Sequence, residues 1–321
     1  MGYGAAANGN TMIGYYSGLN ITTGDDNVAV GYQAGKTITT DNYVVAIGSD
    51  AYSANDTTTG HEGTASDGSG TVAIGYQSMT GLNHVNCLRN TAVGFKTMQQ
   101  GTTHDPSDNV AIGYKALTAV NDGDNNVAIG SSAGLAITTG SNNVVIGKAA
   151  ADELLSGQYN VAIGINAMHT ANGAESKNVA IGYDALALMN IDNDNYNTVV
   201  GYQCGDGITT GGQNTGLGAS CAFDVDANNQ TCIGYQATTS AANAVKIGNG
   251  SVSAANIQVD WTIDSDIRIK KDVEDNTLGL SFINSLKPKK YRKLHPADWD
   301  KEIREKRYEK DERDEFDDVK V

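Results

Sequence analysis

A short segment near the C-terminus holds the side chains best suited to chemistry in this 321-residue chain. Ser265 supplies a hydroxyl and Lys270 an amine, with Asp266 and Arg268 between them. A Ser-Lys pair acts in nucleophilic catalysis only when the ammonium loses its proton near neutral pH. Burial or neighbouring positive charge, such as that of Arg268 or Lys271, favours this loss. The residue types therefore suit Ser-Lys chemistry, and their geometry depends on the fold around them.

The same residues also allow a structural interpretation. Five positions separate Ser265 from Lys270, so the two side chains meet only in a turn or across chains. A serine that precedes acidic residues is also a common helix N-cap. Catalysis and helix capping both stay open from these residues alone.

Most of the chain upstream of this segment is a repeat. Fourteen copies of a phrase typified by residues 27–34 run to about Gly250, and a glycine anchors each copy. The glycines stand mostly 17 to 19 residues apart, and such a period predicts a solenoid with one coil per copy. One longer interval contains residues 55–70, a Thr/Gly/Ser-rich run that we expect to be a surface loop inserted into one coil.

Each copy predicts a short strand. The residue before each glycine is Ile, Val or Leu, the residue two earlier is Val or Thr, and the residue between them is usually Ala. We expect the larger residues to line the inside of the coil and the small ones to lie outside, where neighbouring chains pack on them. Asn precedes the glycine by four residues in ten copies, and stacked Asn side chains are expected to hydrogen-bond along the axis.

The repeat also resembles a known family. Asn-Val-Ala-Ile-Gly occurs intact at residues 109–113, 126–130, 160–164 and 178–182. It is similar to the head repeat of YadA-type adhesins over about residues 10–250, although the coils are a few residues longer than that family's usual repeat. The resemblance implies a trimeric, left-handed parallel β-roll. The expected fold class is all-β, a parallel β-roll or β-solenoid of about 14 coils over residues 1–250, with a short α-containing C-terminal segment.

A second resemblance begins where the period ends. Residues 251–264 form a neck or linker, and Ser265, Asp266, Arg268 and Lys270 make a Ser-Asp-x-Arg-x-Lys motif. With the apolar residues 278–283 that follow, the motif resembles the start of the endosialidase-type intramolecular chaperone, the peptidase S74 domain, over about residues 261–300. This family trimerises a phage tail fibre or spike and then cuts itself off.

The S74 resemblance implies the roles of these residues. Ser265-Asp266 is the expected scissile bond, Ser265 the nucleophile and Lys270 its base, with Arg268 supporting the motif. Attack in cis, in trans or through an activated water stays open. The family's domain is longer than residues 265–321, so we expect these residues to be its N-terminal part. A chain that starts inside a coil also predicts an attachment domain encoded elsewhere.

Charge narrows the choice of partners. Residues 266–321 hold 15 basic and 15 acidic side chains, so the whole net charge of −15 lies in residues 1–265, most of it in the repeat body. A field of that sign argues against nucleic acid or an anionic membrane as ligand. There is no run of 18 apolar residues, and we therefore expect no membrane insertion.

Cysteines and aromatic residues fit the repeat. Cys204, Cys221 and Cys232 occupy positions that hold Ala in other copies, so we expect small buried side chains, with a Cys204–Cys221 disulfide as the alternative. An aromatic residue follows the glycine in eight copies, which predicts a structural stack, with sugar stacking as the alternative. These residues are Tyr15, Tyr32, Tyr76, Phe95, Tyr114, Tyr183, Tyr202 and Tyr235.

Metal sites are not expected. Asp-x-Asp runs begin at Asp122, Asp192 and Asp224, but none completes a calcium-binding loop, and turns explain them better. The five histidines are scattered without ligand spacing. The sequence therefore predicts neither a metal nor another cofactor.

These observations favour a structural component of a phage tail fibre or spike. Its expected partners are two further copies of itself, other tail proteins and a host cell-surface receptor, with glycans among the candidates. Its expected location is the virion, after synthesis in the host cytoplasm. A trimeric autotransporter adhesin is the alternative, but it does not predict the Ser265 motif. A glycan-degrading enzyme fits less well because the repeat has no distinct catalytic domain with paired carboxylates. Any enzymatic activity is expected to be a single act of autoproteolysis.

Overall fold

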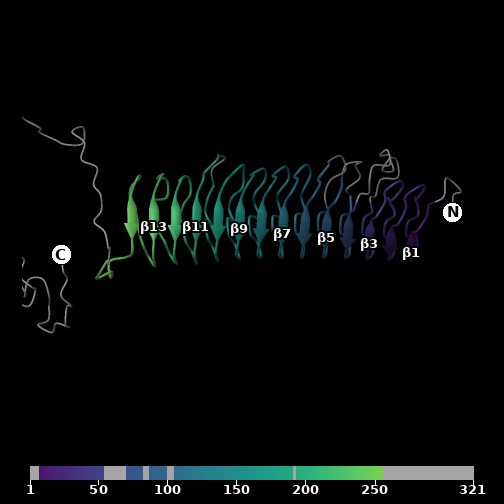
Figure 1. Cartoon of the computed structure of the whole chain (residues 1–321), viewed down its shortest axis with the longest axis horizontal. Helices are drawn as coiled ribbons and strands as arrows, with labels where there is room; N and C mark the ends of the chain where they lie inside the picture. The colour runs from purple at the N-terminus through teal and green to yellow at the C-terminus, as the bar shows by residue number, and fades with distance from the viewer. Residues whose placement is uncertain (1–6, 54–69, 82–86, 100–104, 191–192, 256–321) are drawn as a thin grey trace, which may run out of the picture. The chain divides into compact units, whose positions relative to one another are not determined.

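A computed structural model describes residues 7–53, 70–81, 87–99, 105–190 and 193–255. The chain divides into two units, residues 1–255 and 256–321, and all described residues belong to the first. Figure 1 shows this unit as one row of short strands joined by loops. No described residue is helical, and the expected all-β class is confirmed. The expected α-containing segment lies outside the described residues.

Fourteen three-residue strands form one parallel sheet, and their order in the sheet is their order in the chain. Each strand consists of the three residues before an anchoring glycine, as the repeat predicts. The strands are β1 (Thr11–Ile13), β2 (Val28–Val30), β3 (Val45–Ile47), β4 (Val72–Ile74), β5 (Thr91–Val93), β6 (Val110–Ile112), β7 (Val127–Ile129), β8 (Val144–Ile146), β9 (Val161–Ile163), β10 (Val179–Ile181), β11 (Thr198–Val200), β12 (Thr215–Leu217), β13 (Thr231–Ile233) and β14 (Val245–Ile247).

Neighbouring strands pair in one constant register. Each middle residue faces the middle residue of the next strand, as Ala111 faces Ala128. The register is unchanged across the longest interval, because β3 pairs with β4 through Ala46 and Ala73. The inserted run therefore leaves the stacking of the coils undisturbed, although residues 54–69 lie outside the described residues.

The glycine after each strand makes a corner that no other residue fits. Gly130 has a φ of +139°, a region that L side chains rarely adopt. A Cβ built on Gly130 would stand 2.5 Å from the carbonyl oxygen of Gly147, the corner glycine of the next coil. Corners therefore approach so closely that both backbone conformation and space require glycine.

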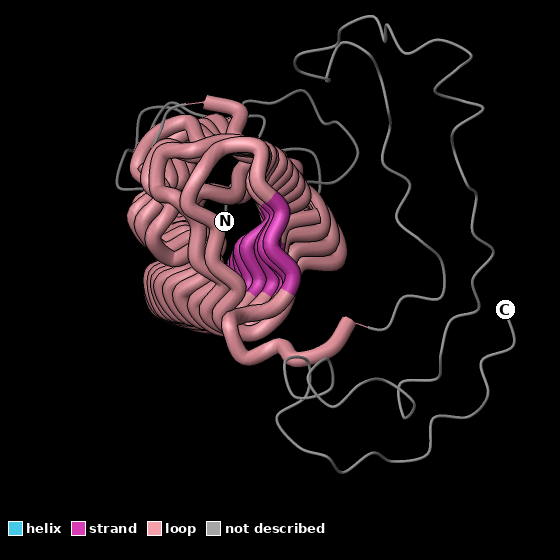
Figure 2. Tube along the Cα trace, turned by 90° about the vertical axis from the view of Figure 1, so that its left-hand side faces the viewer, coloured by secondary structure: helices cyan, strands magenta, loops and turns pink. Residues whose placement is uncertain are grey.

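The two faces of the strands are the reverse of the prediction. The middle residue points into the coil, and Ala128 is fully buried, whereas its neighbour Ile129 is 36% exposed. Figure 2 shows that strands form only one wall of the coil, and loops complete the rest. Buried side chains from those loops, such as Leu117 and Ile137, fill the interior. The middle position of most strands therefore holds a small side chain, with Val145 and Val199 the largest that are fully buried there, and the first and third residues are turned outward.

A column of buried asparagines connects the coils. Asn126 is fully buried, and its backbone N–H donates to the side-chain Oδ1 of Asn109 at 2.9 Å. Its Nδ2 donates to the Gly140 carbonyl at 2.8 Å, and its Oδ1 accepts from the backbone N–H of Asn143 at 3.0 Å. The expected hydrogen bonding of stacked Asn side chains along the axis is confirmed.

Replacement of one member of this column tests its contribution to stability. Asn126→Ala leaves buried backbone groups without partners, and each costs roughly 1–3 kcal/mol. We expect the free energy of unfolding in urea to fall by about that amount. The matched control is Asn190→Ala, because Asn190 is exposed. Equal stability of the two variants would show that the column is dispensable.

Candidate functional site

The outward side of the sheet is a continuous apolar surface. We call it the outer sheet face, and it consists of the first and third residues of strands β1–β14. The third residue of each strand is Ile, Val or Leu. All fourteen of these side chains are partly or largely exposed, as with Leu217 at 53%. The face can bury apolar area against another surface, but it offers no group for chemistry.

An aromatic column runs along the solenoid beside the corner glycines. It contains the eight aromatic residues that directly follow a corner glycine, and members on neighbouring coils stack in four pairs. The ring centroids of Tyr76 and Phe95 are 5.3 Å apart, and those of Phe95 and Tyr114 are 5.5 Å apart. The pairs Tyr15–Tyr32 and Tyr183–Tyr202 stack at 5.9 and 5.2 Å. The predicted structural stack is confirmed, although all eight rings remain exposed at their edges.

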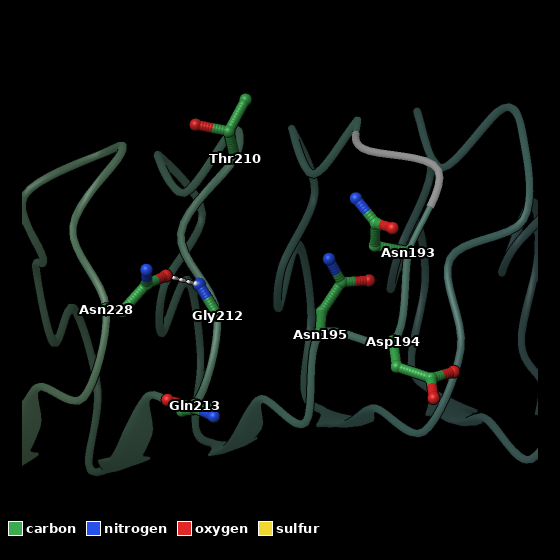
Figure 3. Close-up of a pocket in the computed structure, with 7 residues that line it drawn as sticks. All are labelled: Asn193, Asp194, Asn195, Thr210, Gly212, Gln213 and Asn228. Carbon is green, nitrogen blue, oxygen red and sulfur yellow. Dashed lines mark hydrogen bonds between the residues drawn. The ribbon is translucent and has the colours of Figure 1, made fainter.

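A polar pocket of about 430 Å³ opens between the turns of neighbouring coils. Figure 3 shows that its residues come from three successive turns, with Asn193, Asp194 and Asn195 on one, Thr210 on the next, and the Asp194 carboxylate pointing away from Thr210. Gly212, Gln213 and Asn228 complete the lining. The Gly212 backbone N–H donates to Oδ1 of Asn228 at 2.6 Å, which ties two of the turns together.

Two carboxylates in and beside this pocket, those of Asp194 and Asp226, are held by an ammonium group and by hydroxyl groups. The Asp194 carboxylate accepts hydrogen bonds from the Lys177 ammonium and the Tyr196 hydroxyl. The hydrogen bond from Lys177 lowers the pKa of Asp194, and Asp194 in turn raises the pKa of Lys177. Hydrogen bonds from the Thr210 and Thr209 hydroxyls lower the pKa of Asp226. The pocket thus presents amides and hydroxyls, with its carboxylate already paired.

Such a lining can hydrogen-bond a hydroxylated ligand. The Asp-x-Asp run that begins at Asp192 predicts only a turn, and the pocket was not predicted from the sequence. The interval from Gly182 to Gly201 is 19 residues, whereas the next interval, to Gly218, is 17. The same step in coil length occurs at Gly113, so spacing alone does not single out the pocket.

The aspartate pairs behave as turn residues where they are described. Oδ1 of Asp124 accepts from the backbone N–H of Ser107 at 2.8 Å, and Oδ1 of Asp224 accepts from that of Asp226 at 3.4 Å. Asp192 lies outside the described residues. Within the described ranges, no group of three or more His, Cys, Asp or Glu side chains could hold a metal ion.

The predicted cleavage motif lies outside the described residues. Ser265, Asp266, Arg268 and Lys270 all belong to residues 256–321, so their roles stay predictions. The neck, residues 251–264, is described only as far as residue 255.

All four cysteines are free and buried. This confirms the expected small buried side chains at Cys204, Cys221 and Cys232, and the alternative of a Cys204–Cys221 disulfide is wrong. Burial raises the pKa of the Cys204 thiol, and the neighbouring Cys221 adds to the rise. Burial also raises the pKa of Cys221. These thiols are therefore poor nucleophiles.

Comparison with known proteins does not assign the chain to a family. No family model matches the chain, and no curated protein is significantly similar to it in sequence. In the part of the chain that the structure describes, no helix has the length and hydropathy needed to cross a membrane.

Thiol labelling tests the state of the cysteines. Iodoacetamide at pH 8 is expected to leave the folded chain unlabelled, because all four thiols are buried away from the reagent and burial raises the pKa of Cys204 and Cys221. After unfolding without a reductant, mass spectrometry should count four labels. Thr210→Cys, at an exposed position, should add one label in the folded state. Two labels after unfolding would instead indicate a disulfide.

Proposed function

We propose that this chain is a structural component of a phage tail fibre or spike that attaches the virion to its host. The observation that carries the proposal is the outer sheet face. A lone chain would expose a row of Val, Thr, Ile and Leu side chains along the whole solenoid, and soluble monomers rarely expose such large apolar areas. A rod built for assembly with identical copies accounts for this composition.

Three parallel copies around a common axis cover the outer sheet face. Cyclic symmetry lets each copy present the same face to the axis, so every row meets its equivalents at the same height. Ile112 and Ile129, at 38% and 36% exposure, lie on successive rows and become buried in such a trimer. The similarity to YadA-type heads favours three copies over two.

The C-terminal segment provides the link to a phage fibre. The Ser-Asp-x-Arg-x-Lys motif follows the repeat rod directly, in the order expected when a chaperone trimerises a fibre and is then released. Ser265 acts as the nucleophile and Lys270 as its base, and the Ser265-Asp266 bond is cut. Other tail proteins and a host surface receptor, with glycans among the candidates, are the proposed partners, and the virion is the proposed location.

Charges placed on the outer sheet face test the trimer. Ile112→Glu combined with Ile129→Glu brings six carboxylates together in a trimer, and an uncompensated buried charge costs about 3–5 kcal/mol. We expect light scattering after gel filtration to give three chain masses for the wild type and one for this variant. Leu155→Glu with Leu188→Glu is the matched control, since both leucines are exposed in turns. A monomeric wild type would refute the assembly.

Intact mass under denaturing conditions tests the processing step. The chain expressed from its complete gene should give a product that ends at Ser265, whereas Ser265→Ala and Lys270→Ala should stay uncut. Ser281→Ala, in the same segment, should be cut like the wild type. An uncut wild type that still forms trimers would contradict self-processing and favour the adhesin head, which does not need the Ser265 motif.

A further inference from the structure

The aromatic column is a strictly aligned series of positions. The carbonyl of each residue that follows a corner glycine accepts the backbone N–H of the second residue after the next corner glycine. Gln33 N–H donates to the Tyr15 carbonyl at 2.9 Å, and Gln77 N–H donates to the Ser49 carbonyl at 3.0 Å. Side chains at these positions therefore lie one above another along the solenoid.

Stacked rings in this column face along the solenoid axis. Their interplanar angles lie between 11° and 27°, and their centroid separations are close to the spacing of about 4.8 Å between neighbouring strands. Each ring within a stack thus covers the faces of its neighbours. A ligand can reach a ring face only where the column is interrupted.

Two interruptions place one small residue between two tyrosines. Ser49 lies between Tyr32 and Tyr76, and Ala219 lies between Tyr202 and Tyr235. Flanking rings at two strand spacings are about 10 Å apart, so an inserted ring would have its centroid about 4.8 Å from each. That distance falls within the range of about 4.5–7 Å for ring contacts. The remaining interior interruption, residues 131, 148 and 165, is three positions long and does not form such a pair.

The rims of these two gaps carry matching polar groups. A glutamine directly follows each of the four flanking tyrosines: Gln33, Gln77, Gln203 and Gln236. The Gln33 amide donates to the Tyr32 hydroxyl at 3.1 Å, so amide and phenol groups meet at the rim. The tyrosines are between 44% and 61% exposed. Each gap thus lies between two tyrosines that are each followed by a glutamine, and at the Ser49 gap Oε1 of Gln77 already accepts from the Gln99 amide at 3.2 Å.

We propose that the Ser49 gap and the Ala219 gap are two equivalent glycan-binding sites, each holding one hexopyranose ring with all substituents equatorial. Such a ring, as in β-linked glucose or N-acetylglucosamine, has axial C–H groups on both faces and hydroxyls at its edge. It meets two aromatic walls with C–H groups and the glutamine amides with hydroxyls. A ring with an axial hydroxyl, as in mannose, sets a polar group against one wall.

This assignment rests on the proposed attachment function and specifies its receptor. The two gaps follow β3 and β12, nine strand steps apart, or about 43 Å along the solenoid. A trimer would present six gaps at two heights. Weak sites repeated in this way bind a long polysaccharide with much higher avidity than a single sugar.

The test fills each gap with the missing ring. The full chain is titrated by calorimetry with cellopentaose, chitopentaose and mannopentaose. Ser49→Tyr with Ala219→Tyr completes the column at both gaps, while Ser131→Tyr extends a stack beyond Tyr114 without closing a gap. We expect the wild type and Ser131→Tyr to bind cellopentaose or chitopentaose, the filled variant to bind at least tenfold more weakly, and mannopentaose to bind none of them.

Three results would overturn the assignment: no binding of either equatorial oligosaccharide by the wild type, equal binding by the filled variant, or loss of trimers on filling. The last would assign the gaps to contacts between copies. A wild type that trimerises and is processed but binds no sugar removes only the glycan sites. A chain that neither trimerises nor is cut would refute the proposed function. If that chain still binds sugar and loses the binding on filling, the glycan sites would be supported without it.

Discussion

The structure depends on the close stacking of identical corners. A parallel sheet of three-residue strands can continue through fourteen rows only if every coil repeats the same backbone path, one strand spacing after the last. The contact between Gly130 and the carbonyl of Gly147 shows how little space this stacking leaves. Because each coil touches only its neighbours, every coil must satisfy this constraint for itself.

Constant register turns each position of the repeat into a column. The buried asparagines become a chain of hydrogen bonds between coils, and the residues after the glycines become the aromatic column. The same alignment turns the alternation within each strand into a buried row and an apolar outer row. A departure from the repeat therefore changes the surface of one coil only. A small residue between two aromatic rings, or a longer turn, is such a departure.

The reversal of the strand faces changes which side chains a neighbouring copy would cover. The sequence pattern predicts a homo-oligomer because small alanines on the outer face would need neighbouring chains to pack on them. Those alanines are satisfied within the coil, and the Val and Ile side chains are the ones left uncovered. The proposed trimer would therefore cover a larger and more apolar surface than packing on alanines would.

The sequence by itself determined the all-β class, the strand positions, the corner glycines and the Asn column, because each follows from residue spacing along one chain. Tertiary structure alone decided which strand face is inside, since that depends on how much interior volume loop residues such as Leu117 fill. It also decided the polar pocket at Asn195, which forms where side chains of three successive turns come together, and the free state of Cys204 and Cys221, which depends on thiol geometry that residue spacing does not specify.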